Sequence, residues 1–380
     1  MGNILANFGP YVVIVTAILA VALLIQLIYY LIIFVRVASF KTLEFKFSNI
    51  KEPVSIVICA RNEAENLTNN LLLLLKQDYP NYEVVVVNDC SDDESQDILE
   101  KFQAEFPHLR TTQIKHDEKF SHGKKLALTI GIKAAQNEWL LLTDADCTPA
   151  GVNWLSSMQR NFTNQNEIVL GYGGYSQRKG FLNKMIRFDT FFIALQYLSF
   201  ALIKAPYMGV GRNLAYRKSL FMKNKGFASH AHIVSGDDDL FINEVAKAGS
   251  IAVEFSAESH TRSIPKTDFH LWTNQKKRHL STGKHYKLGH KFLLGGEITS
   301  RFFFYASILL LIINTETWIL GLSALFFRGI VQLIIFNGAM IKLNEKKILI
   351  LFWLFDLILP LINIFLYSIN TFNSKQNKWN

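Results

Sequence analysis

The chain has 380 residues, of which 50% are hydrophobic and 19% are charged, and 40 Lys and Arg against 31 Asp and Glu give a formal net charge of +9. This mixture indicates a polar domain joined to membrane segments, and no nucleic-acid-binding motif occurs, so the basic balance favours anionic lipid or phosphate over nucleic acid as a partner. The three scattered cysteines have no metal-ligand spacing and fit a reducing compartment.

An apolar segment covers residues 11–35 and is interrupted only by Thr16 and Gln26. It exceeds the ~20 residues that a spanning helix needs. No basic segment precedes it and no small-residue cleavage site follows it, so a membrane anchor over residues 1–36 is expected instead of a signal peptide. The positive-inside rule then places the N-terminus outside and the next domain in the cytoplasm, because basic residues follow at Arg36, Lys41, Lys46 and Lys51.

Strand-like and helix-like segments alternate over residues 53–149. Apolar, often β-branched runs predict strands at residues 53–60, 84–87, 111–114 and 139–142. Helices are expected between them, the first with a face of leucines. This alternation predicts an α/β fold with a doubly wound, mostly parallel sheet. Dinucleotide dehydrogenases and P-loop enzymes are disfavoured, because neither Gly-x-Gly-x-x-Gly after the first strand nor a Walker sequence occurs.

Two carboxylates, Asp144 and Asp146, follow the strand predicted at residues 139–142. Alternate residues of a strand point the same way, and open α/β sheets bind ligands at the carboxyl ends of their strands. The two groups repel each other unless a cation lies between them, and Mg²⁺ or Mn²⁺, shared with a diphosphate, fits such oxygen ligands. A solvated turn is the alternative, since Asp and Thr-Pro are common in turns.

Beyond Pro149 the alternation ends. Residues 167–175 predict a strand that ends in glycines. Residues 181–205 are apolar and aromatic but contain four charged side chains, so we expect an interfacial amphipathic helix on the inner leaflet, with a buried core helix as the alternative. The basic and aromatic residues 265–291 could form a second interfacial element.

Three further apolar runs, residues 302–314, 318–341 and 348–369, predict a C-terminal membrane bundle of about three helices over residues 298–370. The first run is short and is expected to borrow residues from Glu297 onward. With the N-terminal anchor this gives four spans and both termini outside, and the basic loop at residues 342–347 falls in the cytoplasm.

Arg328 and Asp356 lie near the middle of adjacent predicted spans. Charges at such depth are costly and usually pair or face a polar pathway, so we predict that these two pair. The alternative is that Arg328 extends its guanidinium to an interface.

Together these motifs resemble the family 2 glycosyltransferases, inverting nucleotide-sugar enzymes with the GT-A (Rossmann-like) fold, and especially their membrane-anchored members. The resemblance runs from about residue 53 to residue 278, and the order and spacing of its short motifs carry it. It implies a cytoplasmic GT-A domain over residues 52–290, with an acceptor-binding and interfacial part at residues 176–290.

On the donor side, the resemblance implies that Ala60, Arg61 and Glu63 lie in the signature that lines the nucleoside pocket. Asp89 matches the residue that accepts a hydrogen bond from uracil. Asn88 departs from the Asp-Asp that is frequent there.

For the diphosphate, the resemblance implies that Lys124 and Arg278 neutralise its charge. Asp144 and Asp146 match the metal and donor carboxylates. Asp146 is expected to be the direct metal ligand and Asp144 a contact of the donor sugar or of the metal's surroundings.

On the acceptor side, Gly236, Asp237 and Asp238 resemble the motif that carries the general base. Asp238 is the predicted base and Asp237 the alternative, because Asp239 makes the alignment ambiguous. Burial beside other acids would raise the pKa of such a carboxylate toward a useful value. Taken alone, three acids at a helix start also fit simple N-terminal capping.

The remaining acceptor contacts implied by the resemblance come from two segments, which contribute Gly211, Arg212, Asn213, Gln275 and His279. His279 stands where the family has Trp in its Gln-x-x-Arg-Trp motif. Loss of this stacking residue argues against a processive polysaccharide synthase.

The resemblance therefore predicts an integral membrane enzyme, in the bacterial inner membrane, that moves a sugar from a nucleotide-sugar, expected to be a UDP-sugar, to a lipid or lipid-linked acceptor or glycan at the inner leaflet. A processive polysaccharide synthase is the first alternative. A noncatalytic subunit that binds nucleotide-sugars is the second.

Overall fold

The computed structural model describes residues 9–41, 51–115, 123–313 and 317–372, so Lys46 and the turn at residues 314–316 lie outside the described part of the chain. A seven-stranded sheet organises the domain, in the order β3-β2-β1-β4-β8-β6-β9. Neighbouring strands are parallel except β8, which runs antiparallel to both β4 and β6. The strands are β1 Val54–Ala60, β2 Tyr82–Asp89, β3 Leu109–Ile114, β4 Trp139–Leu142, β6 Ile168–Gly171, β8 Leu214–Arg217 and β9 Ile251–Glu254.

The elements predicted over residues 53–142 are confirmed. Helices α4 (Ala64–Leu75), α5 (Ser95–Glu105) and α6 (Lys124–Ala134) separate β1 to β4 in the chain. The leucine face of α4 is buried in one core with α5 and α7 (Trp154–Gln159), whereas α6 packs on the opposite face of β1 and β2. Burying an apolar side chain such as Leu71 contributes roughly 1.5–3 kcal/mol, so covering both faces holds the strand ends in fixed positions.

The strand predicted over residues 167–175 divides into two strands that belong to different sheets. β6 joins the large sheet, and β7 (Gly173–Tyr175) pairs with β10 (Thr261–Ser263). β10 also pairs with β5 (Cys147–Pro149), which directly follows Asp146. This three-stranded sheet therefore links the segment of Asp144 and Asp146 to the C-terminal half of the domain.

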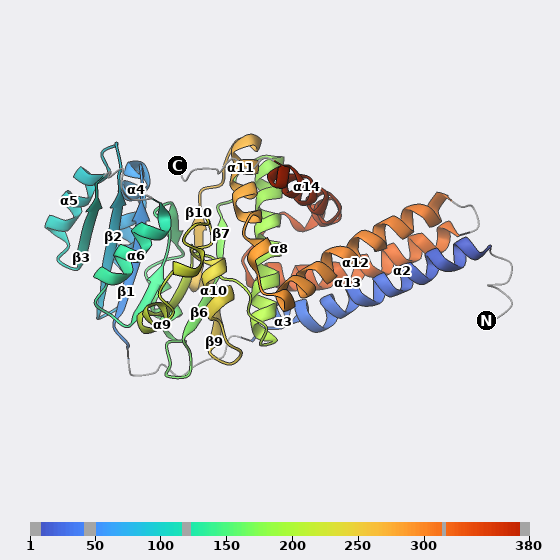
Figure 1. Ribbon diagram of the computed structural model, residues 1–380, viewed down its shortest axis with the longest axis horizontal. Helices are drawn as coiled ribbons and strands as arrows, with labels where there is room; N and C mark the ends of the chain where they lie inside the picture. Colours follow the sequence, from blue (N-terminus) through green and yellow to red (C-terminus); the bar gives the residue numbers. More distant parts are fainter. Residues whose placement is uncertain (1–8, 42–50, 116–122, 314–316, 373–380) are drawn as a thin grey trace.

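Among the described residues, five helices are long and apolar enough to cross a membrane, by length and composition. Four coincide with the predicted spans. They are Pro10–Ala38, which runs as α2 (Pro10–Ile28), a π-helical turn η1 (Tyr29–Phe34) and α3 (Val35–Ala38), then α12 (Leu288–Ile313), α13 (Trp318–Lys342) and Leu349–Ile369. As expected, the first C-terminal span borrows residues before residue 302. α2, α12 and α13 lie side by side and extend away from the sheet (Figure 1).

The fifth candidate is α8 (Phe181–Leu202), for which an interfacial helix was expected. α8 crosses the base of the α2–α12–α13 bundle (Figure 1). Most of its residues are buried, and two of its charged side chains have partners: Arg187 pairs with Glu345, and Asp189 pairs with Lys276. These contacts are those of the alternative, a buried core helix.

The last helix, α14 (Phe352–Phe372), differs from the expected third member of a C-terminal bundle. Its first turns contact α12 and α13, where Asp356 pairs with Arg301 and Arg328, and the helix also packs against α8 and α11 (Phe269–Leu280) (Figure 1). The N-terminal α2 takes the third place in the bundle. The sequence identified the span but did not indicate its contacts with α8 and α11.

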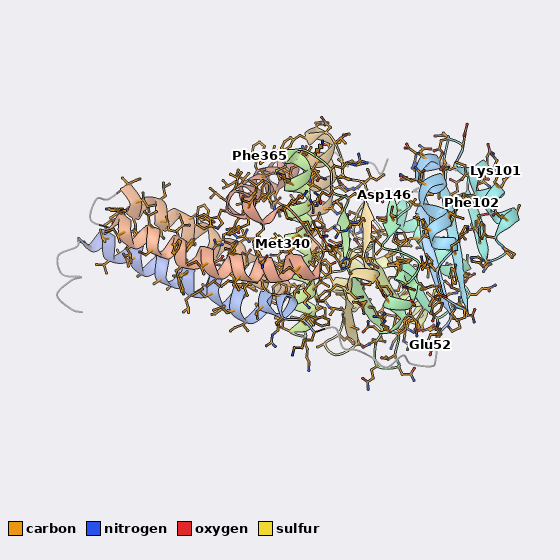
Figure 2. The ribbon with its side chains drawn as sticks, turned by 180° about the vertical axis from the view of Figure 1, so that it is seen from behind. Glu52, Lys101, Phe102, Asp146, Met340 and Phe365 are labelled. Carbon is orange, nitrogen blue, oxygen red and sulfur yellow. The ribbon has the colours of Figure 1, made fainter. Side chains whose placement is uncertain are left out.

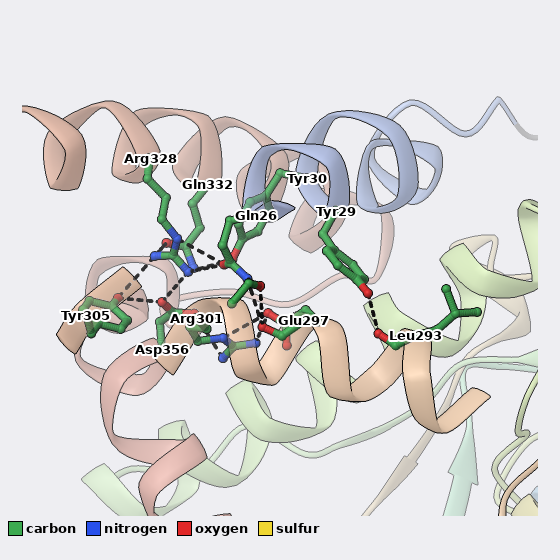
Figure 3. Close-up of polar contacts among 11 residues, drawn as sticks. Gln26, Tyr29, Tyr30, Leu293, Glu297, Arg301, Tyr305, Arg328, Gln332 and Asp356 are labelled. Atoms are coloured by element: carbon green, nitrogen blue, oxygen red, sulfur yellow. Dashed lines mark hydrogen bonds and ion pairs between the residues drawn. The ribbon is translucent and has the colours of Figure 1, made fainter. Parts of the chain in front are cut away.

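The predicted pair of Arg328 and Asp356 is confirmed. Arg328 Nη2 donates to Asp356 Oδ2 at 2.9 Å, and each side chain is only 1% exposed. Figure 3 shows that further polar groups complete the cluster, since Tyr305 donates to the same carboxylate oxygen at 2.7 Å and Arg328 donates to Gln26 at 2.8 Å. Arg301 also pairs with Asp356, at 3.3 Å. The guanidinium of Arg328 therefore does not extend to an interface.

Candidate active site

The loops that follow β1 and β2 are hydrogen-bonded to each other. Asn62 donates its N–H to Ser91 Oγ at 2.9 Å, and its side chain accepts from the Asp92 N–H at 2.8 Å. Asn62 also has a φ of 54°, which turns the chain sharply after the strand. The two strand-end loops therefore form one rigid edge.

Along this edge lie most of the predicted nucleoside-binding residues. Ala60 and Asp89 are fully buried at the ends of β1 and β2, while Arg61 and Glu63 are half-buried in the turn. Asn88, which departs from the family pattern, turns its amide to Gln96 on α5 at 2.9 Å. Its side chain thus supports α5, and Asp89 is left as the acidic residue at this position.

Lys124, at the start of α6, bridges two carboxylates from different elements. Its Nζ lies 2.9 Å from Asp144 Oδ1 and 3.1 Å from Asp237 Oδ2. Although burial alone would lower it, these carboxylates hold the pKa of Lys124 well above its usual value. The sequence motif of Gly123 and Lys124 is therefore brought to the two acidic motifs, and a fixed cation stands between them.

Asp146, the second carboxylate after β4, faces the three-stranded sheet. Ser263 Oγ donates to Asp146 Oδ2 at 2.5 Å. Burial and then the charge of Asp144 raise the pKa of Asp146. Figure 2 shows Asp146 between the part of the sheet that carries α4 and α5 and the helices near the bundle.

These residues fit a divalent cation. Ligand atoms of Asp144, Asp146 and Cys147 all lie within 4.8 Å of one another. Two carboxylates that destabilise each other's charge gain from a bound cation, and hard oxygen ligands suit Mg²⁺ or Mn²⁺ better than the buried thiol does. The carboxylate pair is therefore the candidate metal centre, with Ser263 orienting one ligand.

The three consecutive acids are separated in role by their surroundings. Asp238 is the N-cap of α10 (Asp239–Val245), and its two oxygens accept from the N–H groups of Gly211 and Asp239, each at 2.8 Å. Burial and the adjacent charges of Asp237 and Asp239 raise the pKa of Asp238 to about 7. The partly exposed side chain of Asp238 therefore both caps α10 and has a pKa suited to accepting a proton.

Its two neighbours are otherwise engaged. Lys124 holds the pKa of Asp237 below its usual value against the effect of burial, so Asp237 stays charged and paired. Asp239 Oδ2 accepts from Tyr286 Oη at 2.7 Å and from Thr282 Oγ1. Asp238 is thus the acid of the three that is free of side-chain partners among the described residues, which favours it over Asp237 as the base.

Predicted acceptor residues meet around a tyrosine that the sequence did not single out. The guanidinium of Arg212 lies 4.4 Å from the ring centroid of Tyr175, a cation–π distance, and Gln275 Nε2 donates to Tyr175 Oη at 3.2 Å. Arg278 is half-buried and His279 exposed on the same helix, α11. An aromatic residue at the end of a strand, directly after two glycines, was the available signal for Tyr175.

The expected acceptor contact of Asn213 is corrected. Asn213 is fully buried, its Nδ2 donates to the carbonyls of Tyr172 and Ser259, and its Oδ1 accepts from Trp154 Nε1. All of its amide is used to join β8 to neighbouring segments. Its role is to fix the backbone that presents Gly211 and Arg212.

A buried carboxylate from the loop between α13 and α14 also reaches this region. Glu345 is fully buried and accepts from Tyr172 Oη at 2.8 Å, from Arg187 Nη2 at 2.5 Å and from Arg262. Arg262 precedes Ser263, the residue that contacts Asp146. The loop between two candidate spans is therefore anchored to β10, the strand whose Ser263 contacts Asp146. Nothing in the sequence near residue 345 indicated this contact.

Comparison with known proteins gives concordant results. Residues 55–224 match the family model described as glycosyl transferase family 2. Over 100 residues, 25% of this chain and 22% of the relative, the chain is 32% identical to the poly-beta-1,6-N-acetyl-D-glucosamine synthase of Staphylococcus epidermidis. Over 243 residues, 60% of this chain and 55% of the relative, it is 27% identical to the probable glycosyltransferase YdaM of Bacillus subtilis. The chain thus spans less than two thirds of the length of these relatives.

Among solved structures, the mannosyltransferase PcManGT from Pyrobaculum calidifontis, in complex with GDP-Man and Mn²⁺, is similar with a TM-score of 0.61. The superposition covers 96% of this chain and 99% of that one at 17% identity. At this identity the likeness concerns the fold, and it extends over both the sheet and the membrane helices.

Proposed function

Because this chain carries a family 2 glycosyltransferase domain with a GT-A fold, we propose that it is a membrane-bound inverting glycosyltransferase that uses a nucleotide-sugar, with UDP-sugars the expected donors. The acceptor in this proposal is a lipid or lipid-linked molecule at the inner leaflet. The observation that carries this proposal is a combination of two features of the site. Asp238 has a pKa of about 7, and Lys124 bridges the carboxylates of Asp144 and Asp237.

In the proposed reaction, an acceptor hydroxyl attacks the anomeric carbon from the face opposite the nucleotide, and Asp238 takes its proton. A carboxylate with a pKa near the working pH is the efficient base for this transfer. The N–H groups of Gly211 and Asp239 fix the position of Asp238, so its proton-accepting oxygen is held in place. The configuration of the anomeric carbon is inverted because the single attack comes from the face opposite the departing nucleotide.

On the donor side, Asp89 and the Arg61–Glu63 turn would hold the nucleoside. Asp144 and Asp146 would hold the divalent cation, which, when bound, screens the charge of the diphosphate. Lys124 lies 2.9 Å from Asp144 and so reaches the same place, where its ammonium would stabilise the departing nucleotide. Arg278 would add a second positive charge.

The arrangement of the membrane helices supports the proposal that the protein lies in the inner membrane, with its catalytic domain in the cytoplasm and a lipid as the acceptor. α8 crosses the base of the α2–α12–α13 bundle, at the junction of bundle and domain (Figure 1). Arg36 at the end of the first span and the basic segment at residues 342–347 between α13 and α14 lie on the side of the domain, in keeping with the positive-inside rule.

A processive polysaccharide synthase is the second candidate, and the similarity to a poly-N-acetylglucosamine synthase favours it. The exposed His279, in place of a stacking Trp, weighs against it. A noncatalytic subunit has less support, because a carboxylate tuned as a base has no use in donor binding alone.

The decisive experiment incubates the purified chain with a panel of UDP- and GDP-sugars, Mn²⁺ or Mg²⁺ and a lipid extract, and measures nucleotide release and product mass. Metal-dependent release with one or two donors is the expected result. Product length separates a single transfer from polymerisation. If no nucleotide is released with any donor, with or without lipid, the proposal is wrong.

A further inference from the structure

A cavity of about 330 Å³ lies between α8, α12 and α14, beside the end of α11. Its walls are mainly apolar and aromatic, including Phe188, Phe192, Phe355 and Leu359. This volume falls within the range of roughly 300–1,000 Å³ that is typical of small-molecule sites. The cavity contains none of the residues assigned above to the donor, the metal or the base.

Side chains at one side of the cavity place its opening among candidate membrane spans. Ile298 on α12 and Ile364 and Tyr367 on α14 line it and are 44%, 48% and 44% exposed. Apolar residues that are exposed on spanning helices face lipid chains. The occupant that reaches this cavity most directly is therefore a membrane lipid whose chain leaves past these residues.

Two polar atoms in the cavity wall have unused hydrogen-bonding capacity. Within the described part of the chain, Glu297 Oε2 and Asn363 Oδ1 are buried and without a hydrogen-bond partner. Glu297 as a whole is only 1% exposed. A buried acceptor left unsatisfied costs about 1–3 kcal/mol, so a ligand that donates hydrogen bonds here would be stabilised.

The charges around the cavity specify the kind of donor. Arg301 already pairs with Glu297 Oε1 and with Asp356, as Figure 3 shows, and Lys276 contacts both oxygens of Asp189. Arg301, the cation among the described lining residues, is thus matched by carboxylates, and the lining carboxylate Asp189 is matched by Lys276. A phosphate-bearing headgroup would need a cation that is not matched, whereas an uncharged hydroxyl needs only the two free acceptors.

We propose that this cavity binds an uncharged lipid with a free hydroxyl, such as a diacylglycerol, whose hydroxyl donates to Glu297 or Asn363. The site also adjoins the catalytic region, because Leu280 in its wall lies two residues before Thr282, which holds Asp239. This inference does not depend on the identity of the transferred sugar or of the acceptor.

The test uses the full chain in nanodiscs and a photoactivatable diacylglycerol, with crosslinked peptides mapped by mass spectrometry. Label is expected on α8 and α14, and unlabelled diacylglycerol is expected to compete. The 3-acetyl ester of the same diacylglycerol, which lacks the hydroxyl, and phosphatidic acid, which is anionic, are expected to compete at least tenfold less well. Equal competition by either lipid, or label confined to other helices, overturns the proposal.

Two variants and one control refine this test. Ile193→Trp fills the cavity from α8 and should abolish labelling, and Asn363→Leu removes one acceptor and should lower the affinity about three- to tenfold. Leu309→Trp adds the same bulk at a 62% exposed position of α12 outside the cavity and should have no effect. Labelling unchanged in Asn363→Leu and Ile193→Trp contradicts the site. Nucleotide release, measured in the same nanodiscs, reports separately on the proposed function.

Discussion

Replacing Asp238 by Asn tests the proposed base most directly. The amide keeps the size of the side chain and one acceptor oxygen for the N–H of Gly211 or Asp239, but it cannot take a proton. General base catalysis typically contributes ~10²–10⁴-fold, which corresponds to about 3–5 kcal/mol of the activation barrier. We expect a loss of turnover of that size with donor affinity nearly unchanged, because Asp238 does not belong to the donor-binding edge.

The pH dependence gives the same residue a second signature. The charged, proton-accepting form of Asp238 predominates above its pKa of about 7, so kcat/KM of the free enzyme should rise with pH through neutrality and level off above it. Asp238→Asn should remove this rise from the residual activity.

The assay measures product formation and donor binding in parallel, the latter by isothermal titration with the UDP-sugar that the panel identifies. Asp239→Asn is the matched comparison, because Asp239 is held by Thr282 and Tyr286 and has no proposed proton to accept. It should retain turnover but move the rise in kcat/KM to lower pH, because it removes one of the charges that raise the pKa of Asp238. A variant Asp238→Asn that retains a tenth or more of the wild-type turnover, or keeps the rise near pH 7, would refute the assignment.

Three further predictions concern the supports of the site. Asp146→Asn should abolish Mn²⁺ binding measured by electron spin resonance, and Ser263→Ala should weaken it about 10-fold, whereas unchanged Mn²⁺ affinity in both would exclude this metal centre. Glu345→Gln should lower the free energy of unfolding by about 3–5 kcal/mol, because the buried guanidinium of Arg187 and the partly buried one of Arg262 lose their common carboxylate; a shift below 1 kcal/mol in chemical denaturation would contradict this. In a double-mutant cycle, Arg328→Gln and Asp356→Asn should show a coupling of about 0.5–3 kcal/mol, and simple additivity would speak against an energetic pair.

The sequence predicted the part of the fold that depends on local patterns. Strands with β-branched runs, such as β1 and β2, and the helices between them follow from residue periodicity, so the strand-end positions of Asp89 and Asp144 could be inferred. The pairing of Arg328 with Asp356 was also predictable, because a charge within a span has few ways to be stabilised.

Contacts between distant segments could not be predicted in this way. Glu345 lies in a loop whose sequence resembles any basic connection between spans, yet it is fully buried against Arg187 and Arg262. Asn213 was assigned to the acceptor because its motif is near the site, whereas its amide holds three distant segments together. In both cases the role depends on partners that are far away in the chain.

Lys124 connects the donor carboxylate Asp144 to the acid cluster at Asp237, and its charge lowers the pKa of the neighbouring Asp238. In the proposed reaction, a diphosphate that draws this ammonium toward Asp144 would remove part of that cationic influence, and the pKa of Asp238 would rise. The charge state of the proposed base would then depend on whether the donor is bound. Through one lysine, donor binding and proton transfer would thus be coupled.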